Sequence, residues 1–362
     1  MSQKDPMARF GDALARDIET GGLTPRPTPV HISPWQAMSL LQKAIRRGRL
    51  ELALLAASTL LGSAPDRFWR RAGIIAFEDI GVADLTTAGV VTVALEGKRF
   101  RKRLGGEWAV AAAITSRMVA SPKNRAADDL FCVLESWPGL ADNRKRLEHL
   151  PIPRLRLIAL TTDHIPLRAL AVRLIFADHR LDLPRRGSPD IGFDVLDELG
   201  VAPTTLAIAR EGYRRTGEML APLVAMLSLE NGLREDVTDD PLPPEVMIGP
   251  LPGWSLDMFT REGRAALAEL LKANAGICQW ARATLPLGGR VEVLAQALFR
   301  VESGLCLGRR DGAKGAELRD LMERECFGLS SDQAVSAMTL MREAIPDLNR
   351  MRSVIMGGKA NA

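Results

Sequence analysis

The sequence is poor in the residues from which β-sheets and many active sites are built. Its 362 residues include a single Tyr and four His, and aromatic residues make up only 5%. Because strands favour aromatic and β-branched side chains, this scarcity disfavours a β-sandwich, and the abundance of Ala and Leu predicts an all-α fold. Hydrophobic residues at 46% and charged residues at 25% are ordinary for a globular protein, and the length suffices for two domains.

Cysteine pairs and long apolar runs are also missing. Cys132, Cys278, Cys306 and Cys326 lie far apart and form no C-x-x-C pair, which predicts reduced thiols rather than a disulfide framework. No stretch of about 18 apolar residues without charge occurs, so we expect no membrane span. These absences favour a cytoplasmic protein, associated with the nucleoid if it binds DNA.

Signatures of catalysis are lacking as well. A phosphate-binding P-loop needs flanking glycines followed by Lys and Ser or Thr, but Lys98 is followed by Arg99 and Lys314 by Gly315. No G-x-S-x-G nucleophile motif occurs. We therefore expect no ATP hydrolysis, no cofactor and no enzymatic activity.

The histidines offer only a weak metal or acid–base hypothesis. They are scattered with no H-x-x-x-H spacing, whereas a metal site needs several converging ligands. The Asp163-His164 and Asp178-His179 pairs would support an enzyme if they met in one cleft. Surface or helix-end positions are the simpler expectation for all of them, namely His31, His149, His164 and His179.

Charge is distributed unevenly along the chain. The net charge of +4 combines a basic segment at 35–130, with 15 Lys and Arg against 9 Asp and Glu, and an acidic segment at 190–270, with 6 against 15. Opposite local charges of +6 and −9 suggest different partners for the two segments, or surfaces that meet in an oligomer.

Helix signals and breakers divide the sequence. Proline and glycine spacing in 1–32 predicts a flexible arm, and a first helical domain is expected over 33–238. Ser33 with Gln36 forms a capping box, Pro34 occupies the first helical position, and Gly48 is placed to end that helix. The segment 239–253 is rich in Pro and Gly and predicts a linker, 254–362 predicts a C-terminal helical domain, and 304–315 predicts a mobile loop.

Two adjacent carboxylates, Glu78 and Asp79, precede Gly81 at the end of an amphipathic pattern. Neighbouring helical residues project about 100° apart, so they do not form a facing catalytic dyad. A structural turn is the preferred interpretation, with ion pairs to Arg46 or Arg71 from the neighbouring helices.

Basic clusters are the strongest sign of a binding partner. The run Lys98, Arg99, Phe100, Arg101, Lys102 and Arg103 surrounds one aromatic residue with cations. Such a cluster neutralises phosphates, and the ring could either stack on an unpaired base or anchor the segment in the core. A solvated face is the simpler alternative for any single cluster. Further candidate contacts are Arg46, Arg47, Arg70, Arg71, Lys123 and Arg125.

Three short patterns carry a family resemblance over about residues 35–135. They are QKAIRRGRLELAL at 42–54, AFEDIGVAD at 76–84 and the weaker ASPKNRA at 120–126, and the stretch 38–81 holds the first pattern and the second as far as Gly81. This part of the chain, within 33–140, resembles the helical region that follows the ATPase core in the replication-associated recombination protein A family of AAA+ ATPases, which is related to clamp loaders. Here Ala76 and Phe77 replace the small residues that the family has before its Glu-Asp pair.

The resemblance implies a role in oligomerisation and in contacts with DNA or with replication and recombination proteins. Combined with the basic clusters, it predicts a non-catalytic helical module that docks on the DNA backbone with little sequence specificity. The alternative is a protein-interaction scaffold or homo-oligomer that does not bind DNA and uses the acidic segment 190–270 to hold a basic partner.

Overall fold

The chain forms an array of packed helices, as its composition predicts. The computed structural model describes residues 6–22, 24–176, 187–230, 232–273 and 276–360. The only sheet within these ranges is a two-stranded antiparallel hairpin, in which Ile248 pairs with Leu251. None of the described helices is long and apolar enough to span a membrane.

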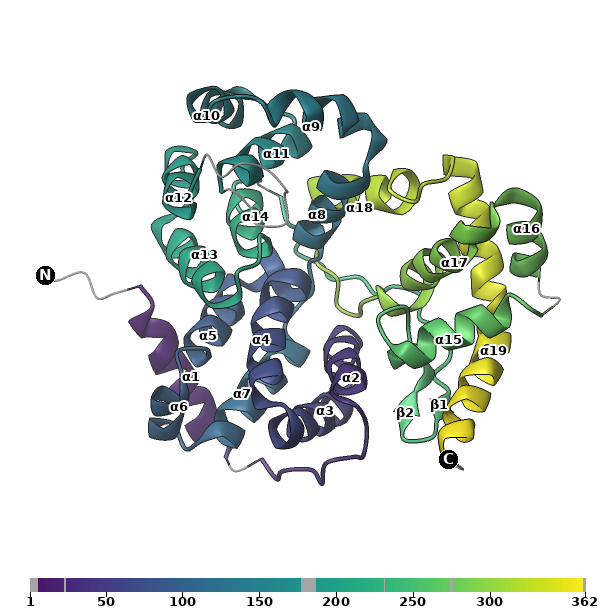
Figure 1. Cartoon of the computed structure of the whole chain (residues 1–362). Helices are drawn as coiled ribbons and strands as arrows, with labels where there is room; N and C mark the ends of the chain where they lie inside the picture. Colours follow the sequence, from purple (N-terminus) through teal and green to yellow (C-terminus); the bar gives the residue numbers. More distant parts are fainter. Residues whose placement is uncertain (1–5, 23, 177–186, 231, 274–275, 361–362) are drawn as a thin grey trace, which may run out of the picture.

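The helices of the first third of the chain pack together in one part of the array (Figure 1). In chain order they are α1 (Ala8–Gly21), α2 (Pro34–Arg46), α3 (Leu50–Ser63), α4 (Pro65–Ile75), the π-helical turn η1 (Ala76–Ile80), the 3-10 turn η2 (Gly81–Asp84), α5 (Leu85–Ala94), α6 (Lys98–Arg103), α7 (Glu107–Ala120) and α8 (Ala126–Ser136).

The middle third continues the same array and contributes to the same hydrophobic core. Its elements are η3 (Pro138–Leu140), α9 (Ala141–Leu147), α10 (Ile152–Thr161), α11 (Ile165–Ile175), α12 (Pro189–Glu198), α13 (Pro203–Thr216) and α14 (Leu220–Leu227).

The C-terminal third builds a second, smaller core on α15, α16, α17 and α19. Its elements are β1 (Met247–Ile248), β2 (Leu251–Pro252), η4 (Gly253–Ser255), α15 (Arg261–Leu270), α16 (Gly276–Thr284), η5 (Leu287–Gly289), α17 (Arg290–Leu298), the π-helical turn η6 (Phe299–Ser303), α18 (Ala313–Glu325) and α19 (Ser331–Ala360).

The predicted start of α2 is confirmed. Ser33 Oγ accepts the backbone N–H of Gln36 at 3.2 Å, and Gln36 Oε1 accepts the N–H of Ser33 at 2.8 Å, with Pro34 at the first helical position. Gly48 follows with φ of +65°, the left-handed conformation expected at the helix end.

Described parts of the predicted arm, linker and mobile loop make contacts with distant segments that no local sequence pattern indicates. In the expected arm, α1 packs against α5 and α7 and buries Phe10 and Leu14. The expected linker contains the β1–β2 hairpin, and its Asp240 is buried in an ion pair with Arg309 at 2.7 Å. The expected loop 304–315 pairs with the segment after α7, since the N–H of Lys123 donates to the Gly308 carbonyl at 2.8 Å.

The domain boundary after residue 253 needs a further correction. Within the C-terminal third, α18 leaves the second core and packs on α8, where Leu318, Met322 and Cys326 join the first core (Figure 1). The two cores are therefore joined by a helix that is distant in sequence from its packing partner.

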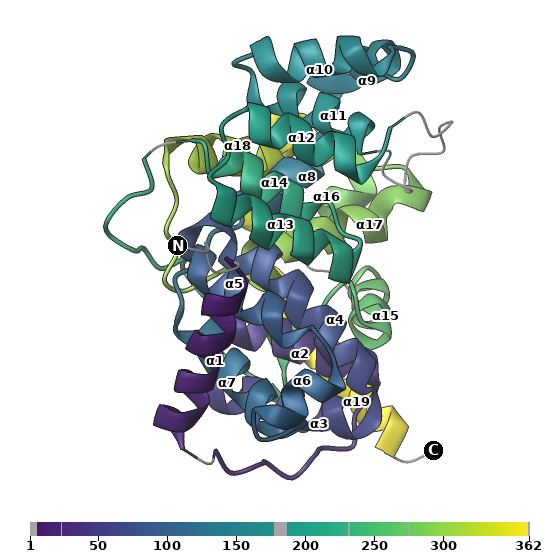
Figure 2. The same cartoon turned by 90° about the vertical axis from the view of Figure 1, so that its left-hand side faces the viewer.

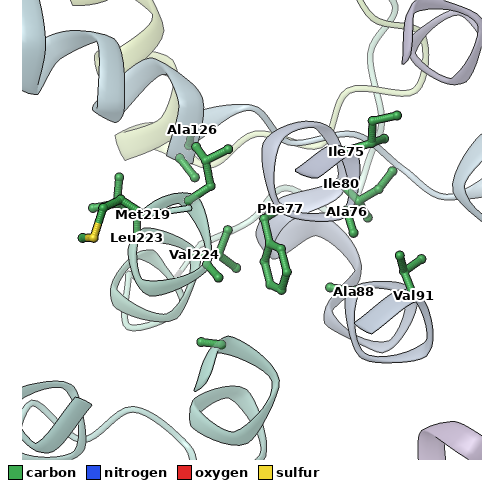
Figure 3. Packing of buried hydrophobic residues seen from close by; sticks show 14 of the residues in the cluster. Ile75, Ala76, Phe77, Ile80, Ala88, Val91, Ala126, Met219, Leu223 and Val224 are labelled. Atoms are coloured by element: carbon green, nitrogen blue, oxygen red, sulfur yellow. The ribbon is translucent and has the colours of Figure 1, made fainter. Parts of the chain in front are cut away.

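The large side chain of Phe77 is buried in a space that a glycine leaves open. Its side chain is 1% exposed and points from η1 toward Val224 of α14, with Ile80 and Ala88 nearby (Figure 3). A Cβ built on Gly212 of α13 would lie 2.2 Å from the Phe77 ring. The glycine thus leaves the space that the large side chain fills.

Candidate functional site

The short helix α6 presents an exposed basic surface on the outside of the array, beside α1 and α7 (Figure 2). Lys98, Arg99, Lys102 and Arg103 are all exposed. Within the part of the chain that the structure describes, none of them forms an ion pair; Arg103 instead lies over the Phe100 ring, 5.6 Å from its centroid. These residues are called the α6 cations below.

The other two residues of the run anchor α6 instead of facing solvent. Arg101 is 5% exposed: its Nε lies 2.9 Å from Glu107 Oε1, and its guanidinium lies 3.9 Å from the centroid of Trp69. Trp69 Nε1 also donates to Glu107, at 2.8 Å. Phe100 is half-buried and packs against the first core. The predicted phosphate contact by Arg101 and base stacking by Phe100 do not fit these positions.

Four further predicted contacts, Arg46, Arg47, Lys123 and Arg125, are buried, with exposed fractions of 4% or less. The C-terminal third covers this side of α2: Arg46 Nη1 donates to the Ser303 carbonyl at 2.9 Å, and Arg47 Nη2 donates to the Glu302 carbonyl at 2.8 Å. These cations are structural in this fold and are not available to phosphates at the surface.

Asp79 is the centre of a buried polar network that connects η1 with α2 and with the residue that precedes α8. Its side chain is fully buried; Oδ1 lies 2.6 Å from Arg46 Nε and also contacts Arg125 Nη1, while Oδ2 accepts from Gln42 Nε2 at 2.8 Å. Burial alone would raise the pKa of Asp79, but Arg46 and Arg125 lower it below the ordinary value. The carboxylate is therefore held charged, as a bridge between α2 and α8.

The neighbouring carboxylates complete this network. Glu78 lies 2.7 Å from Arg46 Nη2, and Asp128 pairs with Arg125. Burial, reinforced by the negative charges of Glu78 and Asp129, raises the pKa of Asp128 to about 7 despite Arg125. The structural role predicted for the Glu78 and Asp79 turn thus agrees with their contacts, and Arg46 is the ion-pair partner while Arg71 is not.

Gly81 closes the turn, with φ of +52°. A Cβ at this position would lie 2.7 Å from the backbone oxygen of Asn124. The N–H of Asn124 donates to the Asp79 carbonyl at 2.8 Å, so the segment before α8 packs directly on the turn. Only glycine satisfies both the left-handed backbone and this close approach.

The last two predicted phosphate contacts, Arg70 and Arg71 of α4, have different surroundings. Arg70 is exposed and lies 3.4 Å from Glu218 of the α13–α14 connection. Arg71 is half-buried, donates from Nη1 to Gln42 Oε1 at 3.2 Å and lines a cleft between the two cores.

That cleft encloses about 460 Å³ between α2, α4 and α8 on one side and α17, η6 and α18 on the other. Both π-helical turns lie at it, η1 through Glu78 and η6 through Phe299 and Arg300. Lys43, Phe299 and Arg300 were not predicted as site residues. No local motif marks them, because the cleft forms only when distant helices pack together.

The histidine hypothesis gains no support from the described residues. His164 caps the start of α11 and is exposed, and Asp178 and His179 lie outside the described residues. Among the residues that are described, no group of three His, Cys, Asp or Glu side chains is arranged to hold a metal ion. The cysteines are free thiols, and burial raises the pKa of Cys132, Cys306 and Cys326.

Comparison of the chain with protein-family models, curated proteins and solved structures finds no match.

Proposed function

We propose that this protein is a non-catalytic helical module that docks on DNA through the α6 cations. The observation that carries the proposal is that Lys98, Arg99, Lys102 and Arg103 are exposed and form no ion pair within the described part of the chain. Lys272 on the second core, by contrast, is exposed but pairs with Glu269 at 2.7 Å.

The way α6 is held supports this proposal. Arg101, Trp69 and Glu107 fix the helix to α4 and α7, so that its cations project from a rigid surface and lose less freedom on binding than a flexible tail would.

The position of Phe100 determines the expected mode of binding. Because its ring packs against the first core, it does not stack on an unpaired base, and the contact is expected to be with phosphates. Binding should therefore show little sequence preference and similar affinity for single-stranded and double-stranded DNA of equal charge density.

Fluorescence anisotropy with labelled single-stranded and double-stranded DNA at low salt tests the proposal. Replacing all α6 cations by Gln should weaken binding by about tenfold or more, since several phosphate contacts are lost together. The matched control replaces Arg264, Lys272, Lys314 and Arg324, which are exposed and paired with carboxylates, and should leave the affinity within about twofold.

A scaffold that does not bind DNA is the alternative outcome of the same experiment. Exposed carboxylates such as Asp194 and Asp197 on α12 could receive the α6 cations of a second copy. In that case DNA would not bind even at low salt, and the mass in solution would fall toward that of a monomer as salt is added or when the α6 cations are replaced.

A further inference from the structure

The cleft between the two cores contains two guanidinium groups that form no ion pair with any carboxylate of the described residues. Arg300 of η6 is 8% exposed; it donates from Nη1 to the Gln296 carbonyl at 3.1 Å and from Nη2 to the Met322 carbonyl at 2.9 Å. Its Nε is buried without a hydrogen-bond partner among the described residues, and burial lowers the pKa of this arginine below its ordinary value.

Arg71 provides the second such group, from α4. Its Nη1 donates to the neutral side chain of Gln42 at 3.2 Å, and its Nε is buried without a hydrogen-bond partner in the described part of the chain. A buried guanidinium without a counter-ion is unfavourable, so the buried Arg300, together with the half-buried Arg71 in the same cleft, indicates a place that is completed by a negatively charged group.

The carboxylates that line the cleft do not supply that group, because each already has a basic partner. Glu78 contacts Arg46 and Arg125, Asp128 contacts Arg125, and Glu292 lies 3.5 Å from Arg264. The other two lining cations are also paired, Lys43 with Asp257 at 2.8 Å and Arg46 with Asp79 at 2.6 Å. Arg71 and Arg300 therefore remain the unneutralised charges of the cleft.

Apolar surfaces complete the lining. Phe259 is 62% exposed and meets Phe299 edge-on, with ring centroids 6.0 Å apart, while Met38 and Met258 line the same space. Exposed aromatic surface inside a cleft is suited to contact with an apolar, planar group. The volume of about 460 Å³ lies within the range usual for small-molecule sites.

We propose that this cleft binds a small organic anion, whose phosphate or carboxylate group lies against Arg71 and Arg300 and whose planar apolar part contacts Phe259 and Phe299. The two π-helical turns agree with this assignment, since such turns are frequent at functional sites, and here η1 and η6 both border the cleft. The proposal is independent of DNA docking by α6, which lies on the outer side of the array.

Isothermal titration calorimetry of the full chain with phenyl phosphate, benzoate, inorganic phosphate and neutral benzyl alcohol tests the proposal. The two aromatic anions should bind more tightly than inorganic phosphate, and benzyl alcohol least. The comparison of phenyl phosphate with benzoate distinguishes a phosphate site from a carboxylate site. Either anion should also raise the melting temperature, because it binds the folded state alone.

Variants on neighbouring positions of α4 give the matched comparison. Arg71→Gln should weaken binding of the aromatic anion by about tenfold, whereas Arg70→Gln, which alters a residue facing Glu218, should leave it within about twofold. Arg300→Met should have an effect similar to that of Arg71→Gln. Because Arg300 is buried and could be needed for folding, the half-exposed Arg71 keeps the test valid by itself.

Failure of every anion to bind at millimolar concentration would overturn the proposal. Equal binding of benzyl alcohol, or equal losses in Arg70→Gln and Arg71→Gln, would do the same. If Arg71→Gln loses anion binding but keeps DNA binding, and replacement of the α6 cations does the reverse, the cleft and the α6 cations are separate sites.

Discussion

At the scale of single residues, burial determines which charged side chains hold the fold and which remain free to bind. The sequence places Arg46, Arg101 and Arg125 in basic clusters, and Arg101 lies in α6 itself. Each of the three is nevertheless buried against a carboxylate. A charge run indicates a basic segment but not the direction of each side chain. That direction depends on helices that pack from elsewhere in the chain, which the sequence pattern does not reveal.

Asp79 should be the most sensitive charged position. Asp79→Asn would leave Arg46 and Arg125 facing each other without this shared carboxylate, and we expect a loss of about 3 kcal/mol or more in the free energy of unfolding. Urea denaturation followed by circular dichroism measures it. Asp194→Asn on the exposed face of α12 is the control and should change stability by less than about 0.5 kcal/mol. Equal stability of the two variants would contradict the structural role of Asp79.

Asp128 should make stability depend on pH near neutrality. Its pKa of about 7 in the folded protein is above the ordinary 3.8, so the folded state holds a proton that the unfolded state releases. Stability from this group is present at lower pH and is lost as the pH rises through about 7.

Asp128→Asn should therefore lose less stability than the parent protein between about pH 6 and pH 8. Melting temperatures at the two pH values measure this difference, and Asp142→Asn, at an exposed position of α9, should behave like the parent. A pH dependence unchanged by Asp128→Asn would show that another group is responsible.

At the scale of elements, local sequence signals predict the ends of a helix correctly where neighbouring residues alone determine the backbone conformation. The capping box of Ser33 and Gln36 begins α2 as predicted, and Gly48 ends that helix region with a positive φ. The same reasoning fails for α1 and for 304–315, because Phe10 and the Gly308 carbonyl find their partners in distant segments. Glycine and proline content indicates where a helix is interrupted, but it does not indicate whether the interrupted segment packs against distant parts of the chain.

Gly48 and Gly81 both have a positive φ, but only at Gly81 would an added Cβ also meet neighbouring atoms. Gly48→Ala should cost about 1 to 2 kcal/mol, since a Cβ there meets nothing within 4 Å and only the left-handed backbone is penalised. Gly81→Ala should cost at least about 1 kcal/mol more, because its Cβ would also press on the Asn124 carbonyl. Chemical denaturation of both variants measures the difference, and equal losses would show that the turn and the segment before α8 are not tightly packed.

At the scale of the whole molecule, the all-α class could be predicted from composition, but the arrangement of two cores around a cleft could not. Buried ion pairs join segments that are distant in sequence. Lys43 with Asp257 joins α2 to the segment before α15, and Arg309 with Asp240 joins the segment before α18 to the segment before β1. Each pair is invisible to a local pattern. The cleft and its Arg300 are therefore consequences of assembly, whereas the basic α6 run is visible directly in the sequence.

The salt dependence of DNA binding tests the central proposal most directly. Between about 50 and 200 mM salt, the logarithm of the affinity should fall linearly with the logarithm of the salt concentration, with a slope of about −3 to −4 if each α6 cation contacts a phosphate. Replacing Lys98, Arg99, Lys102 and Arg103 by Gln should bring the slope close to zero. Absence of binding at the lowest salt, or a slope unchanged by these replacements, would contradict DNA docking by α6.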